Sequence, residues 1–352
     1  MPTILDNTDR LLVIKPTSLG DVVQSLCAVC AIKRTKPSVT LDFLVADIYT
    51  DLLKGHKYID EVLTFPRKRM KGGLSEFTRA FGGLRRDLKH RDYDTALDLQ
   101  GLARSAISAK MSKARHRVGF ADSREMAPLF YSHKVDSPRK SVHAVRRYLQ
   151  AARYIGAEAS EQDVRFALKP TDSTKQSVRA LLPENAFCAL VPGARWETKK
   201  WPLHHFRQLA RVIQDEHGLA VVIVGSPDEK ELGERVVTEI EGDVHNLAGR
   251  TSLPQLLAVL SEAKAVVSND SGPMHLAAAA GVPTVSFFGP TSPERIAPWG
   301  QEELVLQTSE PCRECYRRKC HTMPAKCLSN ISVKKAAAML SVALEKRRPE
   351  HD

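Results

Sequence analysis

Short apolar runs alternate with longer stretches of helical spacing along most of the chain, and the pattern starts again after about residue 183. The apolar runs before the restart are 11–15, 41–46, 61–65 and 95–99, with helical stretches at 21–35 and 74–91. Those after it are 187–191, 220–224, 265–268 and 284–288, separated by helical stretches at 204–216, 229–241, 253–262 and 274–280. Strands that are apolar throughout are typical of parallel sheets covered by helices on both faces.

The restart predicts an α/β protein with two Rossmann-like, doubly wound domains. We expect them to span residues 1–175 and 183–330, with a linker over 169–184, where two prolines and several polar residues lie, and a C-terminal helix and tail over 331–352. Two such domains facing each other would form a cleft at the carboxyl ends of their strands, where open α/β sheets bind ligands.

Composition narrows the choice of partners and compartment. The net charge of +11 favours an anionic partner, such as a phosphorylated molecule, a membrane surface or nucleic acid. No signal peptide is visible and no run of about 18 apolar residues occurs, so no transmembrane helix is expected. Cys27, Cys30 and Cys188 lie in apolar stretches and are expected to be buried free thiols, as in a reducing cytoplasm.

The first motif is Lys-Pro-Thr-Ser-Leu-Gly-Asp at residues 15–21, between the first apolar run and the first helical stretch. Gly20 would permit a tight turn, and Asp21 would stand at the start of the helix. One interpretation is that Asp21 only caps the helix. The other is a general base for an acceptor hydroxyl, ionised at neutral pH because a helix N-terminus stabilises the carboxylate.

The second motif is Asn-Asp-Ser-Gly-Pro-Met-His at residues 269–275. A strand, a glycine-containing turn and a helix N-terminus form an anion site from free backbone N–H groups. Ser271 and His275 would add donors beside Asp270 and Gly272; the alternative is a capped turn with a surface histidine. A Ser-His-Asp triad is excluded, because its members converge from distant loops.

Two more motifs follow apolar runs in the second half. Lys199, after Val-Pro-Gly-Ala-Arg and just before Trp-Pro, would neutralise a departing diphosphate, unless it belongs to a solvated basic loop. Trp201 is expected to be a packing anchor. Either Asp228 or Glu229 would bind ribose hydroxyls, with helix capping as an equal alternative.

Basic residues and cysteines provide two further patterns. The first half carries a basic set that binds phosphates or forms a solvated face: Arg67, Lys68, Arg69, Lys71, Arg104, Arg124, Arg146 and Arg147. The second half carries four cysteines, which would be a structural zinc site if they are not free thiols: Cys312, Cys315, Cys320 and Cys327.

Together these motifs resemble the family 9 glycosyltransferases, the heptosyltransferases of lipopolysaccharide core synthesis. The resemblance runs from about residue 11 to 331 and depends on the combination of SLGDVVQSL, DLQGLARSA, VPGARWETKKWP and NDSGPMHLAAAAGVPTVSFFGPTSPER. It implies the GT-B fold, an inverting reaction without a catalytic metal or other cofactor, an ADP-heptose donor and a Kdo-lipid A acceptor. The segments HAVRRYLQAARYIGA and REMAPLFY look closer to the enzyme that adds the first heptose.

The resemblance also assigns roles. It makes Asp21 the catalytic base, Lys199 the ligand of the donor diphosphate, and Asp228 or Glu229 the nucleotide-binding acid. It places Asp270, Ser271, Gly272 and His275 in the donor turn, and Arg104, Arg124 and Arg147 on the acceptor side. An enzyme acting on a lipid-linked acceptor is expected at the cytoplasmic face of the inner membrane. Because no apolar anchor is visible, its membrane association should be peripheral and should weaken at high salt.

Two other functions compete with this interpretation. One is a nucleotide-sugar epimerase on the same scaffold. The other is a binding module for an anionic surface; nucleic acid is not expected, because the charge is dispersed and no aromatic residues interleave with the basic run.

Overall fold

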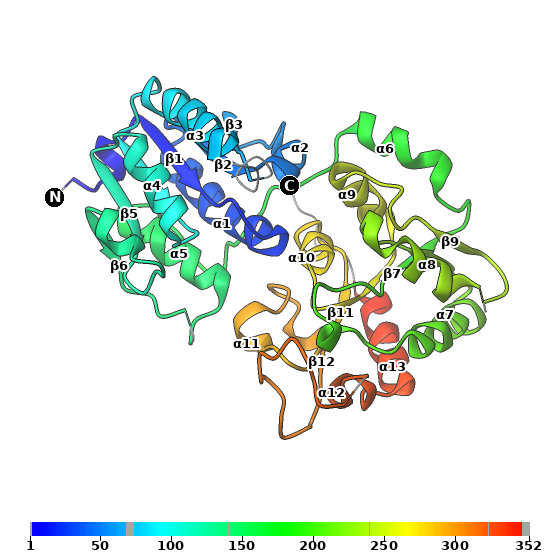
Figure 1. Cartoon of the computed structure of the whole chain (residues 1–352). Helices are drawn as coiled ribbons and strands as arrows, with labels where there is room; N and C mark the ends of the chain where they lie inside the picture. The colour runs from blue at the N-terminus through cyan, green and yellow to red at the C-terminus, as the bar shows by residue number, and fades with distance from the viewer. Residues whose placement is uncertain (1, 68–73, 140, 239, 323, 347–352) are drawn as a thin grey trace. The chain divides into compact units, whose positions relative to one another are not determined.

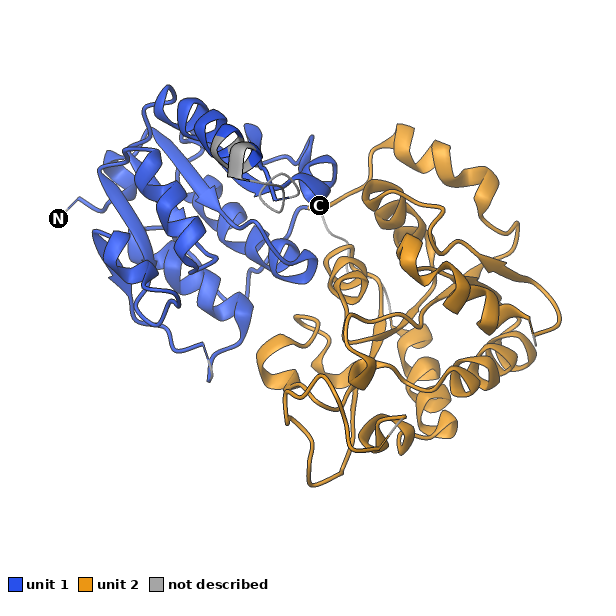
Figure 2. Cartoon of the chain, viewed as in Figure 1, with its two compact units in different colours: residues 1–167 blue, residues 168–352 orange. Residues whose placement is uncertain are grey.

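The computed structural model describes residues 2–67, 74–139, 141–238, 240–322 and 324–346. The chain forms two compact units, Met1–Ala167 and Leu168–Asp352, which are coloured separately in Figure 2. None of the helices in the described part of the chain is both long and apolar enough to cross a membrane.

Unit 1 contains a six-stranded parallel sheet with the strand order β3-β2-β1-β4-β5-β6 (Figure 1). Its strands are β1 Arg10–Ile14, β2 Thr40–Ala46, β3 Glu61–Phe65, β4 Thr95–Asp98, β5 His116–Phe120 and β6 His133–Val135. Its helices are α1 Leu19–Thr35, α2 Thr50–Leu53, α3 Leu74–Lys89, α4 Ala103–Met111 and α5 Ala144–Ile155. Helices α1 and α5 pack together, and α3 packs with α4.

Unit 2 repeats this arrangement in a six-stranded parallel sheet with the order β12-β11-β10-β7-β8-β9. Its strands are β7 Phe187–Val191, β8 Ala220–Ile223, β9 Val244–Asn246, β10 Val266–Asn269, β11 Thr284–Phe288 and β12 Val305–Gln307. Its helices are α6 Asp172–Val178, α7 Leu203–His217, α8 Lys230–Val237, α9 Leu253–Glu262, α10 Gly272–Ala279, α11 Pro293–Ile296, α12 Lys326–Ser329 and α13 Val333–Glu345.

The two sheets share one doubly wound topology, which confirms the predicted α/β fold class. In each, the chain runs outward in one direction over three strands and then returns to the middle of the sheet to run outward in the other. The reversal occurs between β1 and β4 in unit 1 and between β7 and β10 in unit 2. Open α/β sheets bind ligands beyond the carboxyl ends of the strands at this point.

The boundary between the units differs from the prediction. It follows Ala167, whereas we predicted a linker over 169–184 and a first domain reaching residue 175. The two prolines that suggested a linker flank helix α6 instead: Thr171 caps it by accepting from the Thr174 N–H at 3.2 Å. The helix packs on α9, and Val178 is fully buried, so this segment belongs to unit 2.

Four strands were absent from the prediction, namely β5, β6, β9 and β12. Three of them, β6, β9 and β12, are sheet edges of three residues each. An edge strand this short contains too few residues for an apolar pattern to stand out from its surroundings.

The C-terminal helix is also part of unit 2 and not a separate region. We predicted residues 331–352 as a helix and tail outside the second domain. Helix α13 instead contributes Ala336, Leu340 and Ala343 to the core that contains Trp201. The Trp201 indole donates to the Ile331 carbonyl oxygen at 2.8 Å, which fastens the start of this segment to the loop after β7.

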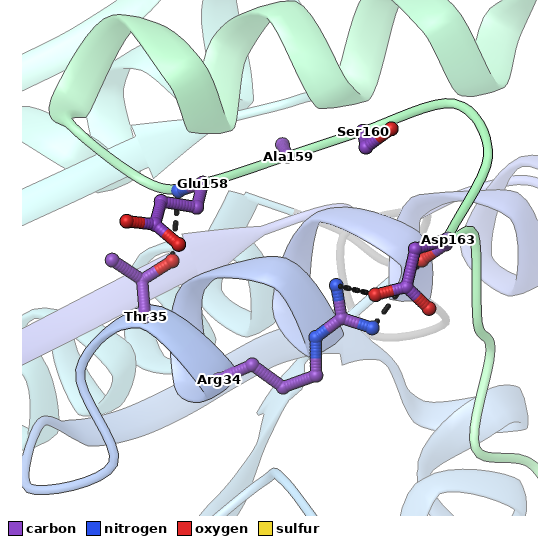
Figure 3. Close-up of a pocket in the computed structure, with 6 residues that line it drawn as sticks. All are labelled: Arg34, Thr35, Glu158, Ala159, Ser160 and Asp163. Carbon is purple, nitrogen blue, oxygen red and sulfur yellow. Dashed lines mark hydrogen bonds and ion pairs between the residues drawn. The ribbon is translucent and has the colours of Figure 1, made fainter.

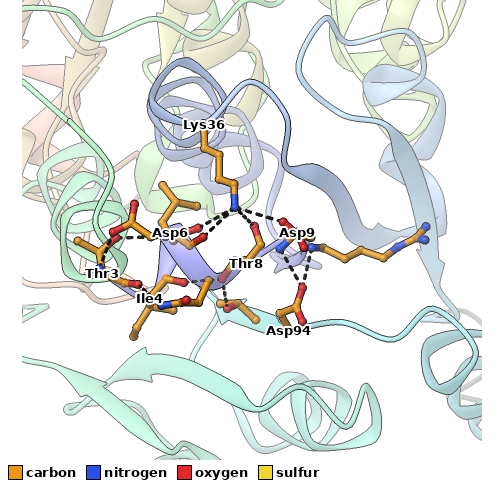
Figure 4. A network of polar contacts seen from close by, with 11 residues as sticks. Thr3, Ile4, Asp6, Thr8, Asp9, Lys36 and Asp94 are labelled. Carbon is orange, nitrogen blue, oxygen red and sulfur yellow. Dashed lines mark hydrogen bonds and ion pairs between the residues drawn. The ribbon is translucent and has the colours of Figure 1, made fainter. Parts of the chain in front are cut away.

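At the amino edge of the unit 1 sheet, polar contacts tie the N-terminal segment to the end of α1. The Lys36 ammonium donates to the carbonyl oxygens of Leu5, Asp6 and Thr8 at 2.8–3.2 Å (Figure 4). A hollow near the same end of α1 has six lining residues, Arg34, Thr35, Glu158, Ala159, Ser160 and Asp163 (Figure 3). Because α1 begins at the carboxyl edge, this hollow lies at the opposite edge of the sheet from Asp21.

Leu340→Ala tests whether α13 is part of the unit 2 core. Leu340 is fully buried, so removing its side chain is expected to lower the free energy of unfolding by about 2–5 kcal/mol. Val342 is 46% exposed on the same helix and serves as the matched control, with an expected loss below about 0.5 kcal/mol for Val342→Ala. Chemical denaturation measures both; equal losses would contradict the packing described above.

Candidate functional site

Asp21 lies in the first turn of α1, beyond the carboxyl end of β1, and it is not the N-cap. Ser18 is the N-cap, and Asp21 is the third helical residue of a capping box. Its Oδ2 accepts from the Ser18 N–H at 3.2 Å and from the Ser18 hydroxyl at 2.8 Å. Gly20, expected in a tight turn, lies inside the helix. The capping box therefore fixes the position of the Asp21 carboxylate, whose side chain remains 40% exposed.

Two buried polar side chains, not identified from the sequence, face the other oxygen of Asp21. The Tyr148 hydroxyl donates to Oδ1 at 3.3 Å, and the Lys15 Nζ lies 3.8 Å from the same atom. The Lys15 ammonium also lies 5.4 Å from the centre of the Tyr148 ring. Burial lowers the pKa of Lys15, and burial together with the Asp21 charge raises the pKa of Tyr148. Asp21 is thus held by donors on both oxygens.

The loop after β4 lies next to the loop that leads to Asp21, because β4 neighbours β1 in the sheet. Gln100 accepts from the Thr17 N–H at 3.0 Å, which joins the loops after β1 and β4. Asp98 ends β4 and is fully buried, and burial raises its pKa. Its carboxylate accepts from the Tyr131 hydroxyl at 2.7 Å and from the Gln100 N–H at 2.8 Å. The buried Asp98 carboxylate therefore fixes the backbone of the loop after β4 by these hydrogen bonds.

The basic residues predicted on the acceptor side differ in exposure. Arg104, in the first turn of α4, and Arg124, after β5, are both exposed. Arg147 is buried instead: its guanidinium pairs with Asp122 and lies 3.8 Å from the centre of the Phe120 ring.

The remaining basic residues do not gather into one group that the structure describes. Arg67 is half-buried just after β3, and Arg146 pairs with Glu161 at 2.9 Å. Lys68, Arg69 and Lys71 lie outside the described residues.

In unit 2, a buried asparagine joins the loops at the topological switch point. The Asn269 Oδ1 accepts from the Trp201 N–H at 2.9 Å, and its Nδ2 donates to the Pro192 carbonyl oxygen at 2.8 Å. The amide thereby connects the carboxyl end of β10 to the loop after β7. It brings together two motifs separated by about 70 residues in the sequence.

Lys199 and Asp270 form an ion pair at this junction. The Lys199 Nζ lies 2.6 Å from Oδ2 of Asp270, with the two side chains only 14% and 6% exposed. The same carboxylate oxygen accepts from the Thr291 hydroxyl at 2.6 Å. The Lys199 ammonium also lies 4.7 Å from the centre of the Trp196 ring. Lys199 is therefore held close to the start of α10 and does not belong to a freely solvated loop.

Helix α10 begins at the turn predicted to bind an anion. Ser271 is its N-cap, Gly272 is its first residue, and the hydroxyls of Ser268 and Ser271 lie 3.2 Å apart. His275, one turn further, is buried with 8% exposure, so the alternative of a surface histidine is wrong. The first backbone N–H groups of the helix provide positive electrostatic potential, and Lys199 lies nearby in its pair with Asp270.

The acid after β8 that lies nearest the switch point is Glu229. Its Oε2 accepts from the N–H and hydroxyl of Ser226 at 2.7 and 2.9 Å, which closes a capping box. Its Oε1 lies against Gly193, where a Cβ would collide with it. Asp228 is exposed. Glu229, and not Asp228, therefore lies beside the loop that follows β7, and its capping box with Ser226 holds it there.

Trp201 is a packing anchor, as predicted. It is fully buried and stacks on Phe287 with ring centres 4.4 Å apart. Cys27, Cys30 and Cys188 are buried free thiols, as also predicted, and burial raises the pKa of each.

The four-cysteine segment follows β12 and packs partly against β11. Cys312 and Cys315 are exposed, whereas Cys327 is buried, with its sulfur beside Gly289. Burial, and then the neighbouring thiols, raise the pKa of Cys327 to about 11. Among the residues that the structure describes, three or more potential metal ligands nowhere gather around one point. Structural zinc here stays a prediction.

The chain is similar to enzymes that transfer heptose. The family model described as glycosyltransferase family 9 (heptosyltransferase) matches residues 82–326. Lipopolysaccharide heptosyltransferase 1 of Pseudomonas aeruginosa is 28% identical over 320 residues, covering 90% of this chain and 88% of that protein. Lipopolysaccharide heptosyltransferase 2 of Salmonella typhimurium is 27% identical over 311 residues, covering 85% and 88%. The structure of the E. coli heptosyltransferase WaaC with ADP-2-deoxy-2-fluoro heptose aligns with a TM-score of 0.75 at 25% identity, covering 95% and 99%.

Arg147→Ala tests whether this side chain stabilises unit 1. Loss of the pair and of the ring contact is expected to lower the free energy of unfolding by about 1–3 kcal/mol at pH 7. Burial by itself would raise the pKa of Asp122. Hydrogen bonds from Arg147 and from the Arg139 N–H outweigh it and lower that pKa below its ordinary 3.8. The pair therefore stabilises the fold above that pH, and its contribution is lost as the pH falls through the lowered value.

Denaturation at pH 7 and at about pH 3 measures the difference. Arg146→Ala is the matched control, because the neighbouring Arg146 is 53% exposed and pairs with Glu161, which is 41% exposed. A pH-independent loss in the Arg147 variant would contradict the role of the ion pair.

Proposed function

Because the chain belongs to glycosyltransferase family 9 and is a glycosyltransferase, we propose that it transfers L-glycero-D-manno-heptose from ADP-heptose to the Kdo-lipid A inner core of lipopolysaccharide. The observation that carries this proposal is the Lys199–Asp270 pair at the start of α10, which offers a lysine and helix N–H groups at the topological switch point. The proposal includes addition of the first heptose, for which the relatives give no preference, since they include heptosyltransferases 1 and 2.

The donor site belongs to unit 2. The diphosphate of ADP-heptose would accept from the N–H groups at the start of α10 and from Ser271, with Lys199 balancing its charge. Glu229 would bind the ribose hydroxyls, with its carboxylate against Gly193, where a Cβ would collide with it. The similar E. coli structure, which contains an ADP-heptose analogue, supports this class of donor.

These groups would stabilise the leaving ADP without a metal ion. Charge develops on the diphosphate as the bond to the anomeric carbon breaks. Lys199 is already in position and partly buried, so little reorganisation is needed when that charge appears.

Asp21 would act as the base in a single displacement with inversion. The Asp21 carboxylate is oriented by Ser18 on one oxygen and by Tyr148 and Lys15 on the other, yet it remains partly exposed. An ionised carboxylate is a weak base. It suits a reaction in which the acceptor hydroxyl becomes acidic only as the new bond forms.

The acceptor carries phosphates and Kdo carboxylates, and the exposed Arg104 and Arg124 have the chemistry to bind them. Arg147 would contribute indirectly, by holding Asp122, because its own guanidinium is paired. A lipid-linked acceptor places the reaction at the cytoplasmic face of the inner membrane, with the enzyme associated peripherally.

The decisive experiment separates transfer from epimerisation. The chain is incubated with a panel of nucleotide sugars, and ADP release is followed with and without a Kdo-containing acceptor. Transfer requires the acceptor, whereas an epimerase changes the sugar without it. Acceptors that do or do not already carry one heptose then distinguish first from second transfer.

Asp21→Asn is expected to lower kcat at least about 100-fold, because the amide cannot accept the hydroxyl proton. The KM for ADP-heptose should change little, since Asp21 belongs to unit 1 and the donor ligands to unit 2. Steady-state kinetics gives both values, and a melting curve serves as the control for the capping box. Near-normal turnover with earlier melting would reduce Asp21 to a cap.

Lys199→Ala is expected to weaken ADP binding about tenfold or more, as loss of a charged hydrogen bond does. Lys200→Ala is the matched control, because the adjacent Lys200 pairs with Glu197 and not with Asp270. Calorimetric titration with ADP measures both. If the Lys199 variant binds ADP as tightly as the control does, the diphosphate lies elsewhere.

Arg104→Ala and Arg124→Ala are each expected to raise the acceptor KM about tenfold, which corresponds to one charged hydrogen bond. The donor KM should stay within about twofold. Arg146→Ala is the control for a loss of surface charge in the same unit. A parallel rise in both KM values would assign these arginines to the fold of unit 1.

A further inference from the structure

Among the residues that the structure describes, the two most exposed large apolar side chains lie in one turn of unit 1. Met126 is 70% exposed and Leu129 is 71% exposed, whereas the next values are 46% for Val342 and 44% for Tyr154. Both belong to the connection between β5 and β6. The Leu129 N–H donates to the Met126 carbonyl oxygen at 3.1 Å, so they are one helical turn apart. Single exposed apolar residues are ordinary, but such a pair on one turn requires an explanation.

This turn is held firmly against α4. Ala127 and Tyr131 pack on Ala106 of α4 in a small buried cluster. The Arg124 N–H donates to the Gly101 carbonyl oxygen at 3.0 Å, and the Glu125 carboxylate accepts from the Ala103 N–H at 3.2 Å. Met126 and Leu129 are therefore presented by an ordered framework.

The backbone adopts an unfavourable conformation to present them. Glu125 and Met126 have φ values of 56° and 59°, in the left-handed region that non-glycine residues rarely occupy. Strain of this kind persists only where surrounding contacts impose it, and it is often associated with function. Here the contacts with α4 impose it, and the result is an exposed methionine.

Three cations lie on the same connection or on α4, against which it packs. Arg104, Lys110 and Arg124 are all exposed, and the Lys110 ammonium lies 5.6 Å from the centre of the Phe130 ring in the same turn. The Glu125 carboxylate is directed at the start of α4, where the helix dipole offsets its charge. The surface formed by Met126, Leu129 and these three cations, here called the basic apolar patch, is thus both hydrophobic and positive.

We infer that the basic apolar patch docks unit 1 on an anionic lipid bilayer, with Met126 and Leu129 inserted at the level of the headgroups. This inference rests on the proposed function, because it gives a lipid-linked acceptor a surface on which to meet the enzyme. Apolar side chains beside Lys and Arg bind anionic membranes by combining buried area with attraction to lipid phosphates. The sequence showed no apolar anchor, because two residues in a loop form no recognisable pattern.

Charge favours a bilayer over a second copy of the chain as the occupant. A symmetric dimer through this surface would bring Arg104, Lys110 and Arg124 of one copy near their counterparts on the other, in a chain whose net charge is already +11. Like charges brought together at an interface oppose association. An anionic bilayer instead complements every cation of the patch.

Vesicle sedimentation with the full-length chain tests the inference. The probes are vesicles of phosphatidylethanolamine with phosphatidylglycerol and vesicles of phosphatidylcholine alone, in the absence of donor and acceptor. The variants are Met126→Ser with Leu129→Ser together, and Ile48→Ser as the control, since Ile48 is 41% exposed elsewhere in unit 1. Analytical ultracentrifugation without vesicles reports the oligomeric state.

The wild type and the Ile48 control are expected to bind the anionic vesicles, and the double variant at least about tenfold more weakly. Binding by the double variant equal to that of the wild type would overturn the inference. So would a failure of the wild type to bind these acceptor-free anionic vesicles, or a wild-type dimer that the double substitution dissociates.

Turnover with a soluble Kdo-containing acceptor without acyl chains keeps the two proposals separate. The double variant should retain wild-type turnover with this acceptor, because neither substituted residue belongs to the proposed reaction site. Loss of vesicle binding with unchanged turnover supports the inference, whereas equal loss of turnover would overturn it. Absence of transfer by the wild type would count against the proposed function, whatever the vesicles show.

Discussion

The buried amide of Asn269 is the contact on which the unit 2 site depends. It ends β10, accepts from the backbone of Trp201 and donates to the backbone of Pro192. Because both partners are backbone groups, neither can rotate away as a side chain could. An unsatisfied buried amide is costly, so the loop after β7 has one favourable position relative to α10. Lys199 then reaches Asp270 because its loop is fixed at Trp201, two residues further along the chain.

Capping boxes perform the corresponding positioning of carboxylates. Asp21 and Glu229 each accept from the N–H and the hydroxyl of a serine three residues earlier, and each stands just beyond the carboxyl end of a strand. Ordinary helix capping therefore gives both carboxylates a defined orientation. In unit 1 the second oxygen faces Tyr148 and Lys15, and in unit 2 it faces Gly193. A capping role and a chemical role at these positions are consequently compatible.

The sequence predicted what depends on repeated patterns and missed what depends on single contacts. The two parallel sheets follow from fully apolar strands such as β7 and β8, and helix starts follow from glycine and serine in the motifs. The burial of Arg147 was not predictable, because Asp122 and Phe120 are distant in sequence. Two adjacent arginines such as Arg146 and Arg147 are also typical of an exposed surface. Tyr148 meets Asp21 only because α5 packs on α1. Only the contact with Gly193 distinguishes the position of Glu229 from that of Asp228, and no local sequence spacing encodes that contact.

The bond from the Trp201 indole to the Ile331 carbonyl oxygen has a consequence for synthesis on the ribosome. The two residues are 130 positions apart, and the core around Trp201 also needs α13, which ends at Glu345. Residues of unit 1 leave the ribosome first, with their sheet complete by Val135 and α5 by Ile155. At about 5–20 residues per second, the loop carrying Lys199 waits on the order of ten seconds for the partner that fixes it. The nascent chain therefore presents Asp21 and the unit 1 surface while the lysine loop of unit 2 is still unanchored.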